Sequence, residues 1–283
     1  MKKYIFSILV LVFLFTACEE NMPVIACLSC ENDDNEMLDP QDKRVLVEEF
    51  TGVRCINCPA GSIEIENLLA FHGERLIAVS IHAEFFAKPY TNESLYDFRT
   101  EEGENIINFL GLPEAYPSSV IDRKIYSGEA DLQLVGLSSW AGRIGNQVLE
   151  IAIVSMELEN TYNAATRELT VKVNGQAQES IEEEVRLTIM ITESGVVDAQ
   201  LTPASSPERD PDYVHKHVLR KTLTAFDGDV LVASMLVGDS FEETYTFTMP
   251  QDWNAANSEV IAFTHLSESS QEVLQATQGH LTD

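Results

Sequence analysis

One stretch decides the fold that this sequence predicts: Val45-Leu46-Val47-Glu48-Glu49-Phe50-Thr51-Gly52-Val53-Arg54-Cys55-Ile56-Asn57-Cys58-Pro59. It begins as an apolar run of the β type, breaks at Thr51-Gly52, and then places two cysteines two residues apart. Apolar residues follow at helical spacing, at Ile63, Ile65, Leu68 and Leu69. The N–H groups and the dipole at the start of a helix favour a thiolate over a thiol. A strand that leads into Cys-x-x-Cys at a helix start is therefore typical of a reactive thiol pair.

The first seventeen residues have the pattern of a targeting segment. Two lysines give a basic start, and the apolar run that follows, residues 4–15, is too short for a stable membrane anchor. Thr16-Ala17 then precedes Cys18, and this ending looks like the cleavage box of a bacterial lipoprotein. The resemblance implies cleavage before Cys18 and acylation of that cysteine. An ordinary signal peptide with an incidental cysteine is the alternative to a lipoprotein signal peptide over residues 1–17.

Export would place the cysteines in a compartment where disulfides form. If Cys18 carries lipid, two Cys-x-x-Cys pairs remain and no cysteine is left over. We therefore expect the disulfides Cys27–Cys30 and Cys55–Cys58, with a second redox-active pair at Cys27 and Cys30 as an alternative. The four cysteines could also form a zinc site, but the 24 residues between the pairs are many for a zinc ribbon. We expect no metal and no cofactor.

Acidic residues dominate the composition. The chain has 46 Asp and Glu against 18 Lys and Arg, and its formal net charge is −28. The acids are spread over both halves of the chain, so they do not form a tail. Such a surface repels nucleic acids and anionic membranes. After the targeting segment, no run approaches the ~18 consecutive apolar residues that a membrane-spanning helix needs. We expect no nucleic-acid partner, and membrane attachment only through lipid.

The first part of the mature chain divides into a tether and an α/β region. Residues 18–42 are rich in Glu, Asp and Asn, which is typical of a solvated tether. Residues 43–149 alternate strand and helix patterns, which predicts a layered α/β domain. The expected strands are 44–50, 75–82 and 116–122, and the expected helices are 60–71, 95–110 and 132–149.

From residue 150 the pattern changes to short runs rich in β-branched residues. Turn-forming residues such as Asn174-Gly175 and Asp227-Gly228 separate these runs. The expected strands are 151–159, 168–177, 185–192, 215–223, 241–248 and 259–266. Strands of this length and spacing predict an antiparallel β-sandwich over residues 150–283.

The strand, the Cys-x-x-Cys-Pro, the helix and a later strand that opens with proline resemble a thioredoxin-like domain. The resemblance implies that Glu49, six residues before Cys55, is a buried acid beneath the active site. It also implies that Pro117 is the cis-proline that faces the cysteines. On this resemblance Cys55, beside Arg54, is the exposed nucleophile of low pKa. Cys58 then resolves the mixed disulfide, and Glu49 handles the proton of the resolving thiol.

Three histidines are further candidates for the site. His82 ends the second expected strand, and a histidine at a strand end is more often packed or hydrogen-bonded than a ligand, although its pKa suits proton transfer. His215 and His217 alternate on one expected strand and should share a face. A metal there would need a third ligand, which the sequence does not identify.

The whole mature chain also resembles the outer membrane protein 28 family of lipoproteins. The resemblance rests on residues 48–52, Cys55-Ile56-Asn57-Cys58-Pro59, Tyr116-Pro117 and His217-Val218-Leu219-Arg220-Lys221-Thr222-Leu223-Thr224. That family pairs a thioredoxin-like domain with an immunoglobulin-like β domain. The resemblance implies a thioredoxin-like domain over 43–149, an immunoglobulin-like domain over 150–283, and lipid anchoring at the outer membrane, on its periplasmic or cell-surface face.

These features predict an exported cell-envelope lipoprotein that exchanges thiols and disulfides with envelope or secreted proteins. Its partners would be protein thiols or disulfides, and the membrane through the N-terminal lipid. The alternative is a non-enzymatic surface lipoprotein, a binding or adhesion module in which Cys55–Cys58 is a structural disulfide.

Overall fold

In the computed structural model, which describes residues 42–267 and 270–282, the opening stretch forms strand β1 (Val45–Thr51) and then helix α1 (Cys58–His72). A single 3-10 turn, η1 (Gly73–Arg75), leads into β2 (Leu76–His82), which pairs with β1 in parallel. Strand β3 (Ser118–Ile121) pairs with the other edge of β1 in antiparallel orientation. Every residue of β1, β2 and β3 is buried, as expected for strands covered on both faces.

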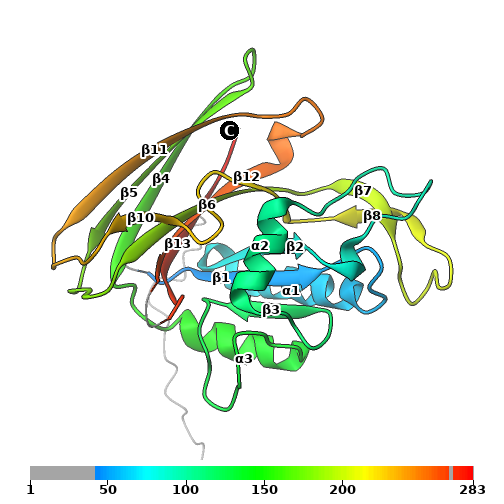
Figure 1. The fold of residues 1–283 in the computed structure, drawn as a ribbon, viewed down its shortest axis with the longest axis horizontal. Coiled ribbons are helices and arrows are strands. Elements are labelled where there is room, and N and C mark those ends of the chain that lie inside the picture. Colours follow the sequence, from blue (N-terminus) through cyan, green and yellow to red (C-terminus); the bar gives the residue numbers. More distant parts are fainter. Residues whose placement is uncertain (1–41, 268–269, 283) are drawn as a thin grey trace, which may run out of the picture. The chain divides into compact units, whose positions relative to one another are not determined.

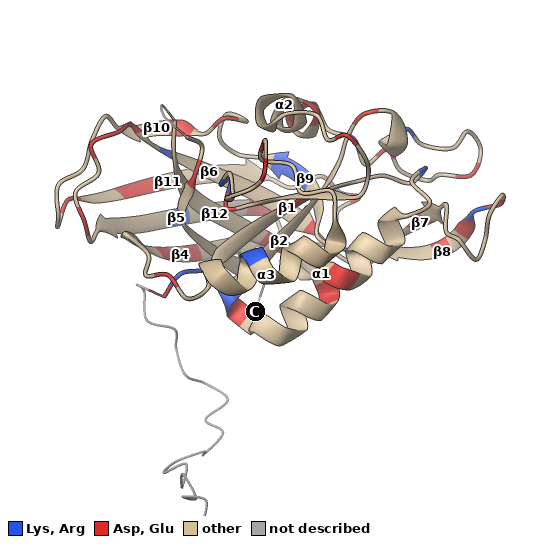
Figure 2. Ribbon diagram, turned by 90° about the horizontal axis from the view of Figure 1, so that it is seen from below, with Lys and Arg blue, Asp and Glu red and all other residues tan. Residues whose placement is uncertain are grey.

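Helices cover both faces of these strands (Figure 2). On one side α1 and α3 (Leu137–Gln147) enclose a core that includes Val45, Ile65 and Trp140. On the other side α2 (Glu101–Leu110) packs through Ile106 and Ile107. The α2 helix begins where the Thr100 hydroxyl accepts a hydrogen bond from Gly103 N, an N-cap that satisfies a free backbone donor. No helix within the described residues is long and apolar enough to cross a membrane.

The remainder of the chain is built from strands, so the fold as a whole is rich in β-structure with few helices (Figure 1). They are β4 (Val154–Asn163), β5 (Glu168–Ala177), β6 (Val185–Glu193), β7 (Val196–Gln200), β8 (Asp210–His215), β9 (Val218–Thr222), β10 (Asp229–Val232), β11 (Ser240–Thr248), β12 (Ser258–Leu266) and β13 (Val273–His280). A three-stranded sheet, β11-β5-β4, packs on part of an eight-stranded sheet. Leu169, Val171 and Val173 alternate along β5 to fill the core between the two sheets.

One sheet crosses the boundary that the sequence suggested at 149/150. Its order is β13-β12-β6-β9-β2-β1-β3, with β10 on β6, and β9 joins β2 in parallel at the pair Ser80 and Val218. The Ser80 N–H also donates to the His217 carbonyl at 2.7 Å. A single core contains Ile77 from β2 together with Met190 and Phe263 from the second half. This sheet and this core therefore continue across the boundary between α3 and β4.

Several elements differ from those that the sequence predicts. The helix expected over 95–110 begins only at Glu101, because the chain before it is extended and the Leu95 and Tyr96 N–H groups donate to the Asp198 carboxylate. The helix expected over 132–149 is shortened to 137–147. The strand expected over 215–223 is interrupted, because β8 ends at His215 and the chain turns at His217, whose φ is 53°.

The first and last strands are tied together at the end of the sheet. The buried Lys43 ammonium donates to the Val273 carbonyl at 2.7 Å and lies 3.3 Å from the Asp122 carboxylate. Next to it, Arg123 and Glu48 form two parallel hydrogen bonds of 2.7 and 2.8 Å, and both side chains are fully buried. The paired geometry offsets part of the cost of removing both charges from water.

Candidate functional site

Cys55 and Cys58 form a disulfide at the start of α1, with their Cα atoms 5.3 Å apart. Cys58 is the first residue of the helix, and its N–H donates to the Cys55 carbonyl at 3.3 Å. The two residues are 3% and 1% exposed, respectively. The expectation that Cys55 would be exposed is therefore wrong. Cys18, Cys27 and Cys30, with the signal peptide and most of the tether, lie outside the described residues.

The β7–β8 arm (residues 196–215) is hydrogen-bonded to the turn that contains Cys55. The Gln200 side-chain amide donates to the Gly52 carbonyl at 3.3 Å and to the Cys55 carbonyl at 3.1 Å. The Leu201 N–H donates to the Val53 carbonyl at 2.9 Å. Sequence spacing shows that the cysteines can pair. It does not show that a segment about 145 residues later lies on top of them.

Arg54, the expected site residue beside Cys55, binds the segment at residues 88–90. Its guanidinium donates to the Lys88 carbonyl at 2.5 Å and to the Pro89 carbonyl at 2.7 Å, and it lies 4.3 Å from the centre of the Tyr90 ring. Arg209 of the β7–β8 arm stacks on the same ring at 4.6 Å. Arg54 thus fastens the turn before Cys55 to the segment that also holds the arm.

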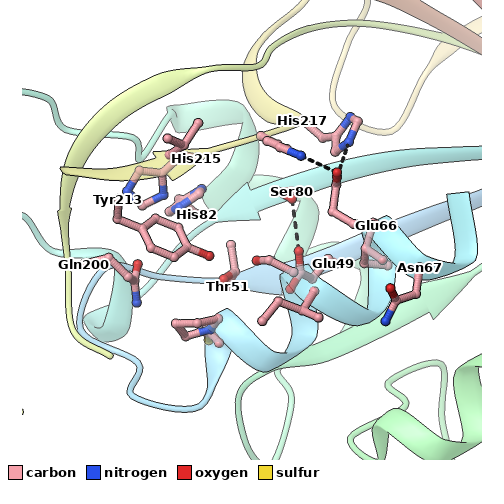
Figure 3. A pocket seen from close by; sticks show the side chains of 17 residues that line it. Glu49, Thr51, Glu66, Asn67, Ser80, His82, Gln200, Tyr213, His215 and His217 are labelled. Carbon is pink, nitrogen blue, oxygen red and sulfur yellow. Dashed lines mark hydrogen bonds and ion pairs between the residues drawn. The ribbon is translucent and has the colours of Figure 1, made fainter. Parts of the chain in front are cut away.

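A cavity of about 280 Å³ lies between α1, the ends of β1 and β2, and β8 (Figure 3). One face of α1 forms a wall, with lining residues at the helical spacing i, i+3, i+4, i+7 and i+8: Pro59, Ser62, Ile63, Glu66 and Asn67. The other walls are Glu49, Thr51, Ser80, His82, Gln200 and residues 213–217. Cys58 also lines the cavity, whereas Cys55 does not.

Glu49 is the buried acid of this cavity. It is 1% exposed, and its Oε2 atom accepts a hydrogen bond from the Ser80 hydroxyl at 3.0 Å. Its Oε1 atom has no hydrogen-bond partner among the described residues. Burial raises the pKa of Glu49 to about 7, and the negative charge of Glu66 adds to that rise. The Ser80 hydroxyl and the nearby Ser62 hydroxyl oppose it.

A glycine in α1 allows the helix to approach Glu49. A Cβ atom at Gly61 would lie 2.7 Å from Glu49 Oε1 and 2.9 Å from the Pro117 ring. Glu49, Gly61 and Pro117 therefore meet at one point beneath the start of α1. The Tyr116–Pro117 peptide bond is cis.

Two histidines form the back of the cavity. His82 and His215 are buried with ring centroids 5.6 Å apart, and both rings pack on Phe98. Burial lowers the pKa of His82 to about 3 and that of His215 to about 4, so both rings are neutral at pH 7. His82 Nδ1 and His215 Nε2 lack hydrogen-bond partners within the described part of the chain.

His217 has a different role from the one its spacing suggested. It lies in the turn between β8 and β9, so it does not share a strand face with His215, although both line the cavity. Its Nε2 atom is 3.0 Å from Glu66 Oε1, and Lys216 pairs with the other Glu66 oxygen. These hydrogen bonds lower the pKa of Glu66 to about 2, and the one with His217 has the largest effect. Over residues 42–267 and 270–282, no three His, Cys, Asp or Glu side chains are placed to hold a metal ion.

The sequence alone did not identify Ser80, Gln200, Tyr213 or Glu66 as site residues. Ser80 is a polar residue in a mostly apolar strand, a feature of the sequence that could have marked it as a site residue. In the structure it lies opposite Glu49 in the parallel register. Gln200 and Tyr213 belong to strands that the sequence pattern did not reveal.

Comparison with known proteins identifies the family of this chain and proteins of similar fold. The family model described as outer membrane protein Omp28 matches residues 108–283. HBP35 of Porphyromonas gingivalis is similar in structure, with a TM-score of 0.65 and 20% identity over 85% of this chain and 76% of that chain. A protein of Agrobacterium tumefaciens has a TM-score of 0.51 and 9% identity over 84% of this chain and 95% of that chain. At these identities the likeness shows a shared fold. None of the curated proteins matches the sequence.

A crystallised domain of the outer membrane lipoprotein Omp28 from Porphyromonas gingivalis covers 46% of this chain at 16% identity, with a TM-score of 0.31. The family model itself spans more than half of the chain, including α3 and β4 to β13. The chain therefore belongs to the Omp28 family of outer membrane proteins, in keeping with a location at the outer membrane.

Proposed function

We propose that the protein is a thioredoxin-like thiol–disulfide oxidoreductase of the cell envelope, and that its Cys55–Cys58 pair exchanges with thiols of envelope or secreted proteins. Glu49 carries the proposal. Its buried carboxyl, which has one unpartnered oxygen, lies in the wall of the cavity that Cys58 also lines. An unpartnered buried polar group costs stability, and a purely structural disulfide has no need of one.

The chemistry of exchange explains why such a carboxyl is useful. An incoming thiol loses its proton, its sulfur bonds to one cysteine sulfur, and the other cysteine leaves as a thiolate that later takes up a proton. A group with a pKa of about 7 accepts and returns a proton at neutral pH. The start of α1 favours a thiolate there through its N–H groups and dipole.

The local topology supports the thioredoxin-like part of the proposal. β1, α1 and β2 form a parallel unit, β3 pairs antiparallel with β1, and Pro117 at the entry to β3 packs by Gly61 and Glu49. In this proposal residues 43–149 carry the redox site. Residues 150–283 form an immunoglobulin-like β region, and its β7–β8 arm covers that site.

A second candidate function rests on the burial of both cysteines. Sulfur atoms held under the β7–β8 arm are shielded from other proteins, and a shielded disulfide acts as a covalent staple. The protein would then be a non-enzymatic outer membrane lipoprotein whose β region binds a partner.

A redox titration separates the two candidates. The purified protein is equilibrated in mixtures of reduced and oxidised dithiothreitol, and the thiols are trapped by alkylation and located by peptide mass spectrometry. A potential for Cys55–Cys58 above about −300 mV, together with catalysed reduction of insulin that Cys55→Ala abolishes, supports the oxidoreductase. A potential below about −300 mV without turnover supports the staple.

A further inference from the structure

The cavity adjoins only one of the two cysteines. Cys58 lines it and Cys55 does not, although both residues are almost completely buried. The Cys55 side is closed by the hydrogen bonds of Gln200 and Leu201 to the turn that contains it. A folded partner protein does not fit into this cavity, so only a small molecule approaches Cys58 while the β7–β8 arm is in place.

The size of the cavity limits the ligand. About 280 Å³ is many times the roughly 30 Å³ that one water molecule occupies in the liquid. It is just below the range of about 300–1,000 Å³ typical of pockets for drug-sized ligands. A molecule about as large as an amino acid fits.

The polar groups of the cavity suit a thiol that carries charged groups. The unpartnered Oε1 of Glu49 is an acceptor for the S–H proton. Lys216, His217 and Glu66 line the cavity together as one hydrogen-bonded group, so its wall contains a cationic and an anionic side chain that pair with each other and that a charged ligand can join. The pair of charges is complementary to the carboxylate and ammonium of an amino-acid thiol.

We propose that this cavity binds a low-molecular-weight amino-acid thiol, or its disulfide, and that the bound molecule exchanges with Cys58 rather than with Cys55. The inference rests on the proposed function and names the substrate class for one of its two half-reactions. It also reverses the order of attack that the resemblance implied, in which Cys55 is the first nucleophile.

The steps balance without any further reagent. The small thiol gives its proton to the Glu49 carboxylate, its sulfur bonds to Cys58 Sγ, and the Cys55–Cys58 bond breaks with Cys55 leaving as a thiolate. That thiolate takes the proton from Glu49. A second small thiol gives up its own proton and attacks the outer sulfur of the mixed disulfide, and Cys58 leaves as a thiolate that takes up a proton. Two thiols become one small disulfide, and the cysteine pair gains two electrons and two protons.

Single-cysteine variants test the order of attack. Cys55→Ser leaves only Cys58 of the pair, and Cys58→Ser leaves only Cys55. Both full-length proteins are first reduced and then exposed to cystine, and the half-cystine adduct is located by peptide mass spectrometry over time. We expect the adduct on Cys58 to form at least tenfold faster than the adduct on Cys55. Equal rates, or a faster reaction at Cys55, would overturn the inference.

A blocked cavity supplies the second measurement. Ile63 lines the cavity and is 62% exposed, so Ile63→Trp narrows the cavity without disturbing the core. Phe71→Trp, at an 82% exposed site on the same helix outside the cavity, is the matched control. In the Cys55→Ser background, Ile63→Trp should slow the reaction of Cys58 with cystine about tenfold, and Phe71→Trp should leave it unchanged. No effect of Ile63→Trp would contradict a route through the cavity.

Failure of the inference and failure of the proposed function give different results. A disulfide that neither cystine-derived thiol nor dithiothreitol opens would overturn both. A reducible disulfide whose adducts appear first on Cys55 would overturn the inference alone and leave the oxidoreductase in place.

Discussion

Replacing Glu49 by Gln should change how the stability of the protein depends on pH. The folded state raises the pKa of this carboxyl from about 4.5 to about 7, so the folded protein holds its proton more tightly than the unfolded chain does. The stability that this group contributes is therefore greatest below pH 4.5 and is lost as the pH rises toward 7. One pKa unit corresponds to about 1.4 kcal/mol, so the full effect is about 3 kcal/mol.

The variant isolates this effect from those of neighbouring groups. Glu66, Ser62, Tyr213, His82 and His215 also face the cavity, but they are present in both proteins and largely cancel in the difference. Between pH 5 and pH 8 the unfolding free energy of Glu49→Gln, relative to wild type, should rise by about 2.5 kcal/mol. The measurement is urea denaturation of the oxidised proteins at both pH values, followed by circular dichroism.

The exposed Glu157→Gln is the matched control, and its difference from wild type should change by less than about 0.5 kcal/mol between the two pH values. A Glu49→Gln difference that stays constant from pH 5 to pH 8 would refute the reasoning. The carboxyl would then titrate normally, and it could not exchange protons at neutral pH as the proposed function requires.

Three more substitutions test other parts of the structure. Glu48→Gln leaves Arg123 buried without its counter-charge and should lower the unfolding free energy by about 3–5 kcal/mol, measured by urea denaturation. Gln200→Ala removes the amide that holds the β7–β8 arm on the turn beside the disulfide. The arm should then bind the turn more weakly by about 1 kcal/mol, and dithiothreitol should reduce the disulfide about fivefold faster. An unchanged rate of reduction would show that the arm does not limit access to the disulfide. Gly61→Ala forces a methyl group to within 2.7 Å of Glu49 and should destabilise the protein by about 1–3 kcal/mol in the same urea assay, despite the better helix propensity of alanine.

Matched controls exist for the first two of these substitutions. Lys172→Ala breaks an exposed ion pair with Glu242 and should cost less than about 1 kcal/mol. Gln176→Ala removes an exposed amide that donates to the Gly238 carbonyl, far from the disulfide in sequence, and should leave the reduction rate as in wild type.

The strands with strong apolar patterns could be predicted from the sequence. β1 opens with an apolar run, β2 is mostly apolar, β5 alternates with period two, and their observed bounds lie within a residue of those expected. The strands that were missed have weak patterns. β7 and β8 are short and contain Asp, β8 also contains Pro, and both form a small two-stranded sheet of their own. Their pairing is decided by tertiary contacts rather than by local preference.

The candidate site was predictable only in part for the same reason. Cys55, Cys58 and Glu49 lie in the opening stretch, whose pattern is strong, and Pro117 opens a later strand; the structure brings Glu49 and Pro117 together at Gly61. The burial of the cysteines and the cavity itself depend on the β7–β8 arm, whose position on the turn at 52–55 no local pattern records. Sequence spacing therefore identified the disulfide pair and missed the segment that packs on the turn beside it.

The tie between the first and last strands has a consequence for biosynthesis. The Lys43 ammonium donates to the carbonyls of Val273 and Leu274, about 230 residues later, and Asp122 accepts from Val273 N. A chain that emerges with its N-terminus first cannot satisfy these buried groups until β13 has been synthesised. Contacts of such long sequence separation also slow folding. The growing polypeptide therefore cannot complete this part of its fold until translation is nearly finished.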